Sequence, residues 1–181
     1  KDEGGGRIRW LTRTEAAEAL LACMGWRKGE DGRMSHIPDR IEGKKHTGGA
    51  RRQIRIRRAH LRRFVILGLY TGTRHMAMVR ARWIESTAEP WIDVNRGLFY
   101  RRGGDERQTN KRQPPVRIPR RLLAHLRRWR EMDMNRVDAD GNPAPVTHVI
   151  HFGGSSLAGT IRTSWEGMRA DARLSDDVVP H

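Results

Sequence analysis

Residues 64–74 of this chain read FVILGLYTGTR, an apolar segment that ends abruptly in Thr-Gly-Thr-Arg. The apolar spacing predicts a helix over about residues 58–70, whose inward-facing residues would be Leu61, Phe64, Val65 and Leu69. Gly72 permits a sharp turn after that helix, so Arg74 would project from a rigid element of the core. A guanidinium held in this way can donate to two oxygens of one phosphate, and it stays protonated at working pH.

Positive charge is the dominant feature of the composition. The 181 residues include 36 Lys and Arg against 21 Asp and Glu, which gives a formal net charge of +15. A basic run over about residues 44–63 leads directly into the helix that precedes Arg74. This balance favours a nucleic-acid partner, because binding to a phosphate backbone releases condensed counterions. A solvated surface or an association with the ribosome would give the same charge balance.

Cysteine usage and hydropathy exclude several classes of protein. Cys23 is the only cysteine, so the chain has neither a disulfide framework nor a Cys-rich zinc site, and we expect Cys23 in the core. This usage fits a reducing compartment such as a bacterial cytoplasm. No segment approaches the roughly 20 apolar residues of a membrane span, and no signal peptide is visible. Because the chain begins at Lys1 rather than Met, we expect a piece of a longer protein.

The first 60 residues predict one clear helix and little else that is regular. Residues 1–8 predict a linker. Thr12 and Glu15 have the spacing of a capping box and predict a helix over about residues 13–25. Residues 27–50 predict a loop or a loosely structured hairpin.

The next elements predict a small sheet between helices. The isoleucines of the basic run alternate with arginines, which predicts a short strand or an extended lead-in around Ile54 and Ile56. A helix over about 75–84 would carry Met76, Val79 and Trp83 on one side. Strands are expected at about 91–94, 97–101 and 116–118, an extended segment at 146–152, and helices from Pro119 onward and over about 158–173. The predicted fold is therefore mainly α, with a small three-stranded antiparallel β-sheet.

Two further residues have chemistry that suits the phosphate held by Arg74. Lys111 lies in a polar turn between two predicted strands, from which a lysine can reach a DNA groove and protonate a departing 5′ oxygen. His181 follows Val-Pro, a context suited to the first turn of a helix. Its ring could donate a hydrogen bond to a phosphate oxygen or transfer a proton.

Other candidate sites are weaker. His148 and His151 would point to opposite faces of an extended segment, and we expect no carboxylate or cysteine nearby to complete a metal site. The helical tryptophans predict core positions rather than base-stacking platforms: Trp83, Trp129 and Trp165. No glycine-rich loop of a nucleotide-binding kind is present.

Together these residues resemble, in order and context, the tyrosine recombinase (phage integrase) family. The segments that carry the resemblance are 10–15, 64–83, Lys111 with 116–119, 172–174 and 179–181. It implies a mainly helical catalytic domain over residues 9–181 that cuts and rejoins double-stranded DNA through a 3′-phosphotyrosyl intermediate, without metal or nucleotide. Arg74, Lys111 and His181 would be the first arginine, the general-acid lysine and the box histidine. Contacts to DNA are expected from Arg57, Arg58, Thr73, Arg101 and Arg112.

The chain also departs from the family pattern. The second arginine and the nucleophilic tyrosine would lie beyond residue 181, and neither Tyr70, on a helix that looks buried, nor Tyr100, in a strand, is a substitute. Met76 and Ala77 stand where many members carry an acidic residue. We therefore expect a cytoplasmic protein that forms tetramers on DNA at full length and is inactive as this chain. The alternatives are a non-catalytic DNA- or RNA-binding domain and a type IB topoisomerase.

Overall fold

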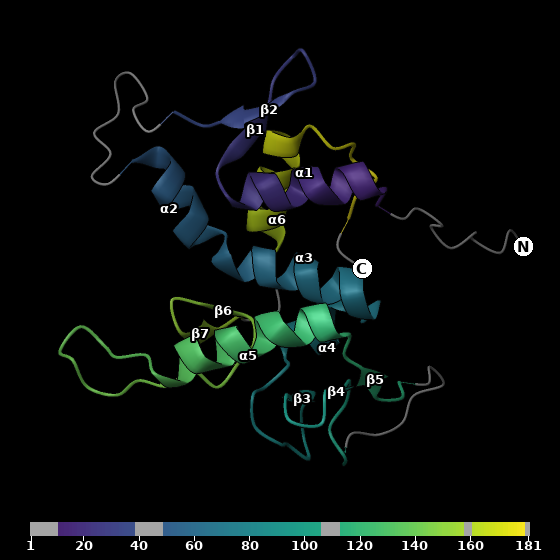
Figure 1. Ribbon diagram of the computed structural model, residues 1–181, viewed down its shortest axis with the longest axis vertical. Helices are drawn as coiled ribbons and strands as arrows, with labels where there is room; N and C mark the ends of the chain where they lie inside the picture. The colour runs from purple at the N-terminus through teal and green to yellow at the C-terminus, as the bar shows by residue number, and fades with distance from the viewer. Residues whose placement is uncertain (1–10, 39–48, 106–112, 158–160, 180–181) are drawn as a thin grey trace, which may run out of the picture. The chain divides into compact units, whose positions relative to one another are not determined.

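The computed structural model describes residues 11–38, 49–105, 113–157 and 161–179 (Figure 1). These residues form six helices and several small antiparallel sheets, a mixed α/β arrangement. They divide into two compact units, one made of the described residues up to Ala59 together with those from Arg162 onward, the other of His60–Ile161. No helix in the described ranges is long and apolar enough to cross a membrane.

The first unit is built on two helices, α1 (Arg13–Cys23) and α6 (Arg162–Ala172), which cross in Figure 1. The predicted capping box is confirmed: Glu15 N donates to Thr12 Oγ1 over 3.2 Å, and Thr12 N donates to Glu15 Oε2 over 2.9 Å. The core of this unit contains small residues of α1 and larger ones of α6: Ala19, Ala22, Cys23, Trp165, Met168 and Ala172.

A β-hairpin follows α1. Of the two alternatives predicted for residues 27–50, a loop or a loosely structured hairpin, the hairpin is the one observed. Strands β1 (Trp26–Lys28) and β2 (Met34–His36) pair antiparallel. Residues 39–48 of the predicted segment lie outside the described residues.

The prediction of a short strand around Ile54 and Ile56 is wrong. Residues Ala50–Arg57 form a helix, α2, whose hydrogen bonding continues into Arg58 N donating to Ile54 O over 2.9 Å. Arg and Gln are good helix formers, and a strand would need a buried face on which both isoleucines could lie. Ile56 is instead 56% exposed, so the alternation of isoleucine with arginine does not correspond to a buried strand face.

The second unit begins with helix α3 (Ala59–Thr71), close to its predicted range. Its buried face is His60, Leu61, Arg63, Phe64, Val65 and Leu67. Leu69 is 46% exposed, so placing it inward was wrong, and Tyr70 lies on this largely buried helix but is itself 40% exposed. Both residues lie in the last turn of α3, beyond Leu67, the last buried residue of the helix.

Helix α4 (His75–Val79) is shorter than the predicted 75–84. The chain leaves the helix because residues 81–83 pair along their backbone with two other segments: Trp83 N donates to Thr147 O and Ile92 N to Arg82 O, both over 2.9 Å. Val79 and Trp83 are buried as predicted, whereas Met76 is 50% exposed.

The three-stranded antiparallel sheet is confirmed, with strands in the order β3 (Trp91–Asp93), β4 (Leu98–Tyr100) and β5 (Val116–Arg117). The turn between β3 and β4 is fixed by Asp93, whose Oδ1 accepts from the backbone N–H groups of Asn95 and Arg96, each over 2.9 Å. Gly97 closes the turn at φ 67°, a conformation that favours glycine.

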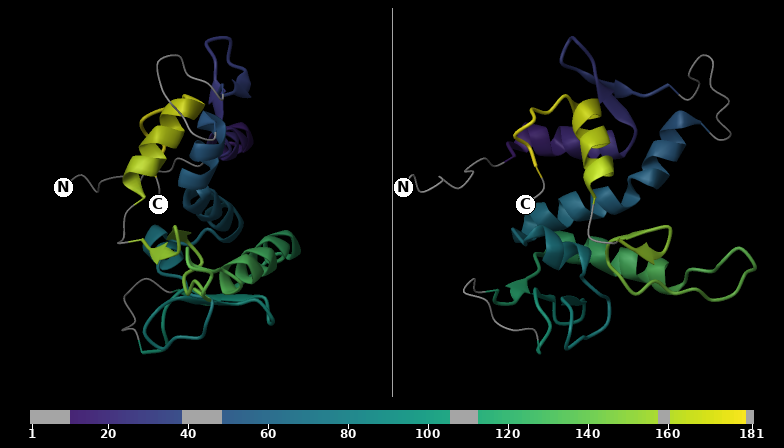
Figure 2. Two further views of the ribbon diagram at one scale, coloured as in Figure 1. Left: turned by 90° about the vertical axis from the view of Figure 1, so that its left-hand side faces the viewer. Right: turned by 180° about the vertical axis from the view of Figure 1, so that it is seen from behind.

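Helix α5 (Arg120–Met134) follows Pro119 as predicted, with Leu122, Leu126 and Trp129 buried. Of the segment expected to be extended, only its end is a strand: β6 (His151–Phe152) pairs with β7 (Ser155–Ser156). The three tryptophans predicted on helices are core residues, although Trp83 lies beyond the end of α4: the exposed fractions of Trp83, Trp129 and Trp165 are 3%, 7% and 6%. Figure 2 gives two further views of these elements.

Candidate phosphate-binding site

The turn between α3 and α4 presents Arg74. Gly72 takes φ 56°, and Arg74 is the N-cap residue of α4 with extended backbone. Thr71 holds the turn on both sides, since its Oγ1 donates to Leu67 O over 2.7 Å and accepts from Thr73 N over 3.3 Å. The Arg74 side chain is exposed, so the turn carries a solvent-facing guanidinium on a fixed backbone.

The neighbours of Arg74 are buried polar side chains. Thr73 is 4% exposed, and its Oγ1 has no hydrogen-bond partner among the described residues. The Nε2 atom of His75 is also buried without a hydrogen-bond partner among the described residues. The His75 ring packs edge-on against Phe64, with ring centroids 5.3 Å apart. Burial lowers the pKa of His75, so its ring is neutral at physiological pH.

Arg101, just beyond β4, is the second cation of the site. Its Nε donates to Pro114 O over 2.9 Å, which fixes the side chain across the sheet end. Burial lowers the pKa of Arg101, and the positive charge of Arg74 lowers it further, so the two guanidinium groups interact. No carboxylate in the described part of the chain pairs with either arginine. Two like charges that no described carboxylate offsets form a place where an anion is stabilised.

The structure thus brings together two of the predicted site residues and leaves three untested. Lys111, Arg112 and His181 lie outside the described residues and stay predictions.

The two predicted DNA contacts in the first unit differ from each other. Arg57 is exposed at the end of α2. The Arg58 side chain is 14% exposed; its Nη1 donates to Ala22 O over 3.0 Å and lies 2.8 Å from Asp171 Oδ2. The guanidinium of Arg58 is therefore occupied by internal partners rather than offered to solvent.

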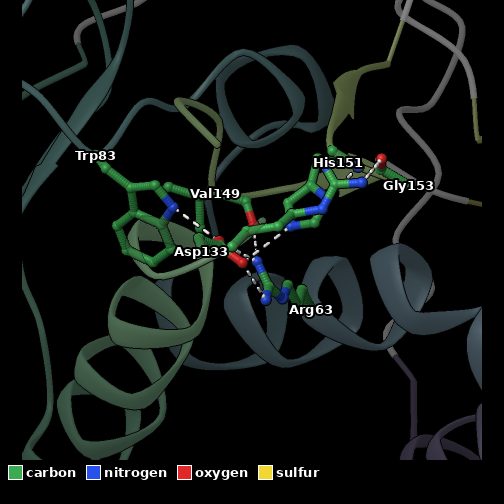
Figure 3. Close-up of polar contacts among 8 residues, drawn as sticks. Arg63, Trp83, Asp133, Val149, His151 and Gly153 are labelled. Carbon is green, nitrogen blue, oxygen red and sulfur yellow. Dashed lines mark hydrogen bonds and ion pairs between the residues drawn. The ribbon is translucent and has the colours of Figure 1, made fainter. Parts of the chain in front are cut away.

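A buried polar cluster around Asp133 was missed by the sequence reasoning (Figure 3). The Asp133 carboxylate accepts from Arg63 Nη1 and Nη2 over 2.6 and 2.9 Å, and from Trp83 Nε1 over 2.9 Å. His151 Nε2 lies 3.1 Å from the same carboxylate. Arg63 also donates to Val149 O over 2.9 Å, so the cluster ties α3 and α5 to two loop segments.

Hydrogen bonding keeps Asp133 ionised inside the protein. Burial by itself would raise the pKa of this carboxyl, but hydrogen bonds from His151 and Arg63, with the charge of Arg63, hold the pKa below its usual value. A signal for the cluster was present, because Asp133 follows Leu126 and Trp129 on the apolar stripe of its helix. A lone acid on such a stripe requires a buried partner.

His151 belongs to this cluster, which corrects the expectation that no carboxylate lies near it. Gly154 N donates to His151 Nδ1 over 3.1 Å, so Nε2 carries the hydrogen and donates to Asp133. His148 contacts Thr147 Oγ1 instead, at 3.0 Å. Over the described ranges, no group of three or more His, Cys, Asp or Glu could hold a metal ion.

Comparison of the chain with protein-family models, curated proteins and solved structures finds no match.

Proposed function

We propose that this protein binds double-stranded DNA and that residues 9–181 form the catalytic domain of a site-specific recombinase of the tyrosine recombinase (phage integrase) family. The observation that carries the proposal is the electrostatic interaction of two guanidinium groups that no described carboxylate pairs with: Arg74, at the turn fixed by Gly72 and Thr71, and Arg101, just beyond β4. The antiparallel sheet inserted between α4 and α5 supports it, because the predicted lysine falls in the connection between β4 and β5.

In this proposal the residues of the chain divide the work on one DNA phosphate. Arg74 donates hydrogen bonds to the non-bridging oxygens of the phosphate, and Arg101 adds a second positive charge. Lys111 protonates the departing 5′ oxygen, and His181 donates to the phosphate. The reaction conserves the phosphodiester energy in a phosphotyrosyl bond, so neither a metal nor a nucleotide takes part. A tetramer on DNA at full length is part of the same proposal.

The 181-residue chain binds DNA in this proposal but does not cut it. It contains two tyrosines, and the Tyr100 ring stacks on Trp91 with centroids 4.1 Å apart. Tyr70 lies in the last turn of α3, two residues before Gly72. A nicked suicide duplex should give no covalent protein–DNA adduct with this chain. An adduct that disappears in Tyr70→Phe would show that the chain cleaves and that its nucleophile was misassigned.

Duplex binding tests the phosphate site directly. Arg74→Ala should weaken binding about tenfold or more, because a charge-assisted contact is lost. Arg74→Lys keeps the charge but loses the planar fork, so it should restore only part of the affinity. The matched control is Arg96→Ala, which removes an exposed arginine of the same unit that pairs with Asp93. Equal affinities for Arg74→Ala and Arg96→Ala would refute the site.

The second candidate is a non-catalytic DNA- or RNA-binding domain, favoured by the exposed basic face of α2. In that case Arg57→Ala should weaken binding as much as Arg74→Ala, each with the loss of about one counterion from the salt dependence. The recombinase proposal predicts the larger loss at Arg74.

A further inference from the structure

Helix α5 carries a basic face that the phosphate site does not use. Four arginines of this helix are exposed: Arg120, Arg121, Arg127 and Arg128. The opposite face of the helix, Leu122, Leu126 and Trp129, is buried in the core. We call these four arginines the α5 basic face.

The spacing of the α5 basic face arranges its charges in two rows. Arg120 and Arg127 are seven residues apart, as are Arg121 and Arg128. Seven residues bring a helix back to within about 20° of the same direction, so each pair lies on one line. At about 1.5 Å per residue, the two members of a row are roughly 10 Å apart along the helix. Each row can therefore reach two separate phosphates of one backbone.

These charges have no counter-ion among the described residues. Other exposed arginines of the chain pair with nearby acids, such as Arg162 with Glu166 over 2.8 Å and Arg96 with Asp93 over 3.8 Å. No ion pair forms between the α5 basic face and any described carboxylate, although Glu131 lies one turn beyond Arg127 and Arg128. The α5 basic face thus differs from those ion-paired arginines, because no described acid offsets its positive charge.

The placement of two of the arginines also opposes the stability of the helix. Arg120 and Arg121 occupy the first turn of α5, where the helix dipole favours negative charge. That turn contains no acidic residue, and Pro119 provides no side-chain cap. A bound anionic backbone would offset both the repulsion within the rows and the unfavourable dipole interaction.

We propose that the α5 basic face is a second contact surface for the phosphate backbone of double-stranded DNA, additional to the site at Arg74. The inference rests on the proposed DNA partner but not on the recombinase chemistry. An acidic protein fits less well, because protein interfaces centre on apolar or aromatic anchors: Ala124, between the two rows, is small, and the exposed Met132 lies only at the end of the face, one turn beyond Arg128. A membrane surface does not fit, because the apolar side of α5 is already buried in the core.

The test measures duplex affinity as a function of salt, from about 50 to 200 mM. The variant replaces all four arginines of the α5 basic face: Arg120→Gln, Arg121→Gln, Arg127→Gln and Arg128→Gln. We expect the slope of log affinity against log salt to become shallower by about 3 to 4, at about 0.9 per phosphate contact. The control removes the same charge from exposed arginines elsewhere: Arg13→Gln, Arg33→Gln, Arg96→Gln and Arg162→Gln. The control should change the slope by less than about one contact.

Two outcomes would overturn the inference. The first is an equal change of slope in the two fourfold variants, which would mean that only net charge matters. The second is an unchanged slope for duplex together with loss of binding to polyglutamate, which would assign the face to an acidic protein. If the fourfold variant does not fold, a double variant of one row replaces it: Arg120→Gln with Arg127→Gln. This double variant should make the slope shallower by about 2.

Arg74→Ala in the same series separates this inference from the proposed function. Loss of affinity in Arg74→Ala, with no effect of the α5 variants, would refute only the α5 surface. A wild-type chain that binds no duplex at about 50 mM salt would refute both.

Discussion

Two arginines, Arg63 within helix α3 and Arg74 in the turn after it, lie in opposite electrostatic surroundings. Arg63 is buried, and its guanidinium meets Asp133 at 2.6 Å and Val149 O at 2.9 Å. Arg74 is exposed, its charge acts on that of Arg101, and no described carboxylate offsets either charge. The comparison indicates that the satisfied cluster holds the second unit together, whereas the unsatisfied pair is positioned for a partner from outside.

Removing Asp133 should have the largest effect on stability. In Asp133→Ala the buried guanidinium of Arg63 loses its counter-ion, so the free energy of unfolding should fall by about 3–5 kcal/mol. Urea denaturation of the variant measures the loss, with Asp140→Ala, an exposed acid, as control. A loss of less than about 1 kcal/mol would mean that the cluster does not hold the unit together.

Replacing both charges of the pair should be less harmful than removing one. Arg63→Met combined with Asp133→Leu substitutes apolar side chains of similar volume and leaves no uncompensated buried charge. The double variant should therefore be more stable than Asp133→Ala by about 1–4 kcal/mol in the same denaturation experiment. Trp83 and His151 would each lose their hydrogen-bond acceptor on Asp133, so the double variant should remain less stable than wild type. A double variant as unstable as the single one would assign the stabilisation to those two partners instead.

Arg74→Ala should leave stability almost unchanged. The side chain is exposed and has no described counter-ion, so the free energy of unfolding should stay within about 0.5 kcal/mol of wild type. Any change should be a small gain, because the repulsion from Arg101 disappears. A loss of more than about 1 kcal/mol would show that Arg74 has an internal structural role.

The smallest expected effect is a pH dependence at His75. Burial lowers the pKa of His75 below its ordinary value of 6.5, so the unfolded chain takes up more protons than the folded one as the pH falls through that value. Stability contributed by the neutral ring is present above about pH 6.5 and is lost progressively below it. In His75→Gln, the fall in stability between about pH 7 and pH 5 should be smaller than in wild type. His148, whose pKa is also lowered by burial, provides the parallel variant His148→Gln.

The regular elements of this chain could largely be predicted, because their signals are local. The capping box at Thr12, the helices before Thr71 and after Pro119, and the three-stranded sheet follow from spacing and composition over a few residues. The basic segment at residues 50–57 was misjudged, because alternation of isoleucine with arginine indicates a strand only when one face is buried.

The site could be predicted only in part, because its partners come from distant segments. Glycine-turn chemistry located Arg74, but the sequence does not show that Arg101 lies near it or that Arg58 pairs with Asp171. The same holds for Arg63 and Asp133, which are 70 residues apart. A tertiary contact of this kind decides which arginines are structural and which are left for a ligand.

The most direct test of the central claim is the salt dependence of duplex binding in the double variant Arg74→Ala with Arg101→Ala. If the two guanidinium groups form a phosphate site, the slope of log affinity against log salt should become shallower by about 2, with folding stability retained. A slope parallel to that of wild type would contradict the account, because it would mean that neither arginine meets a DNA phosphate.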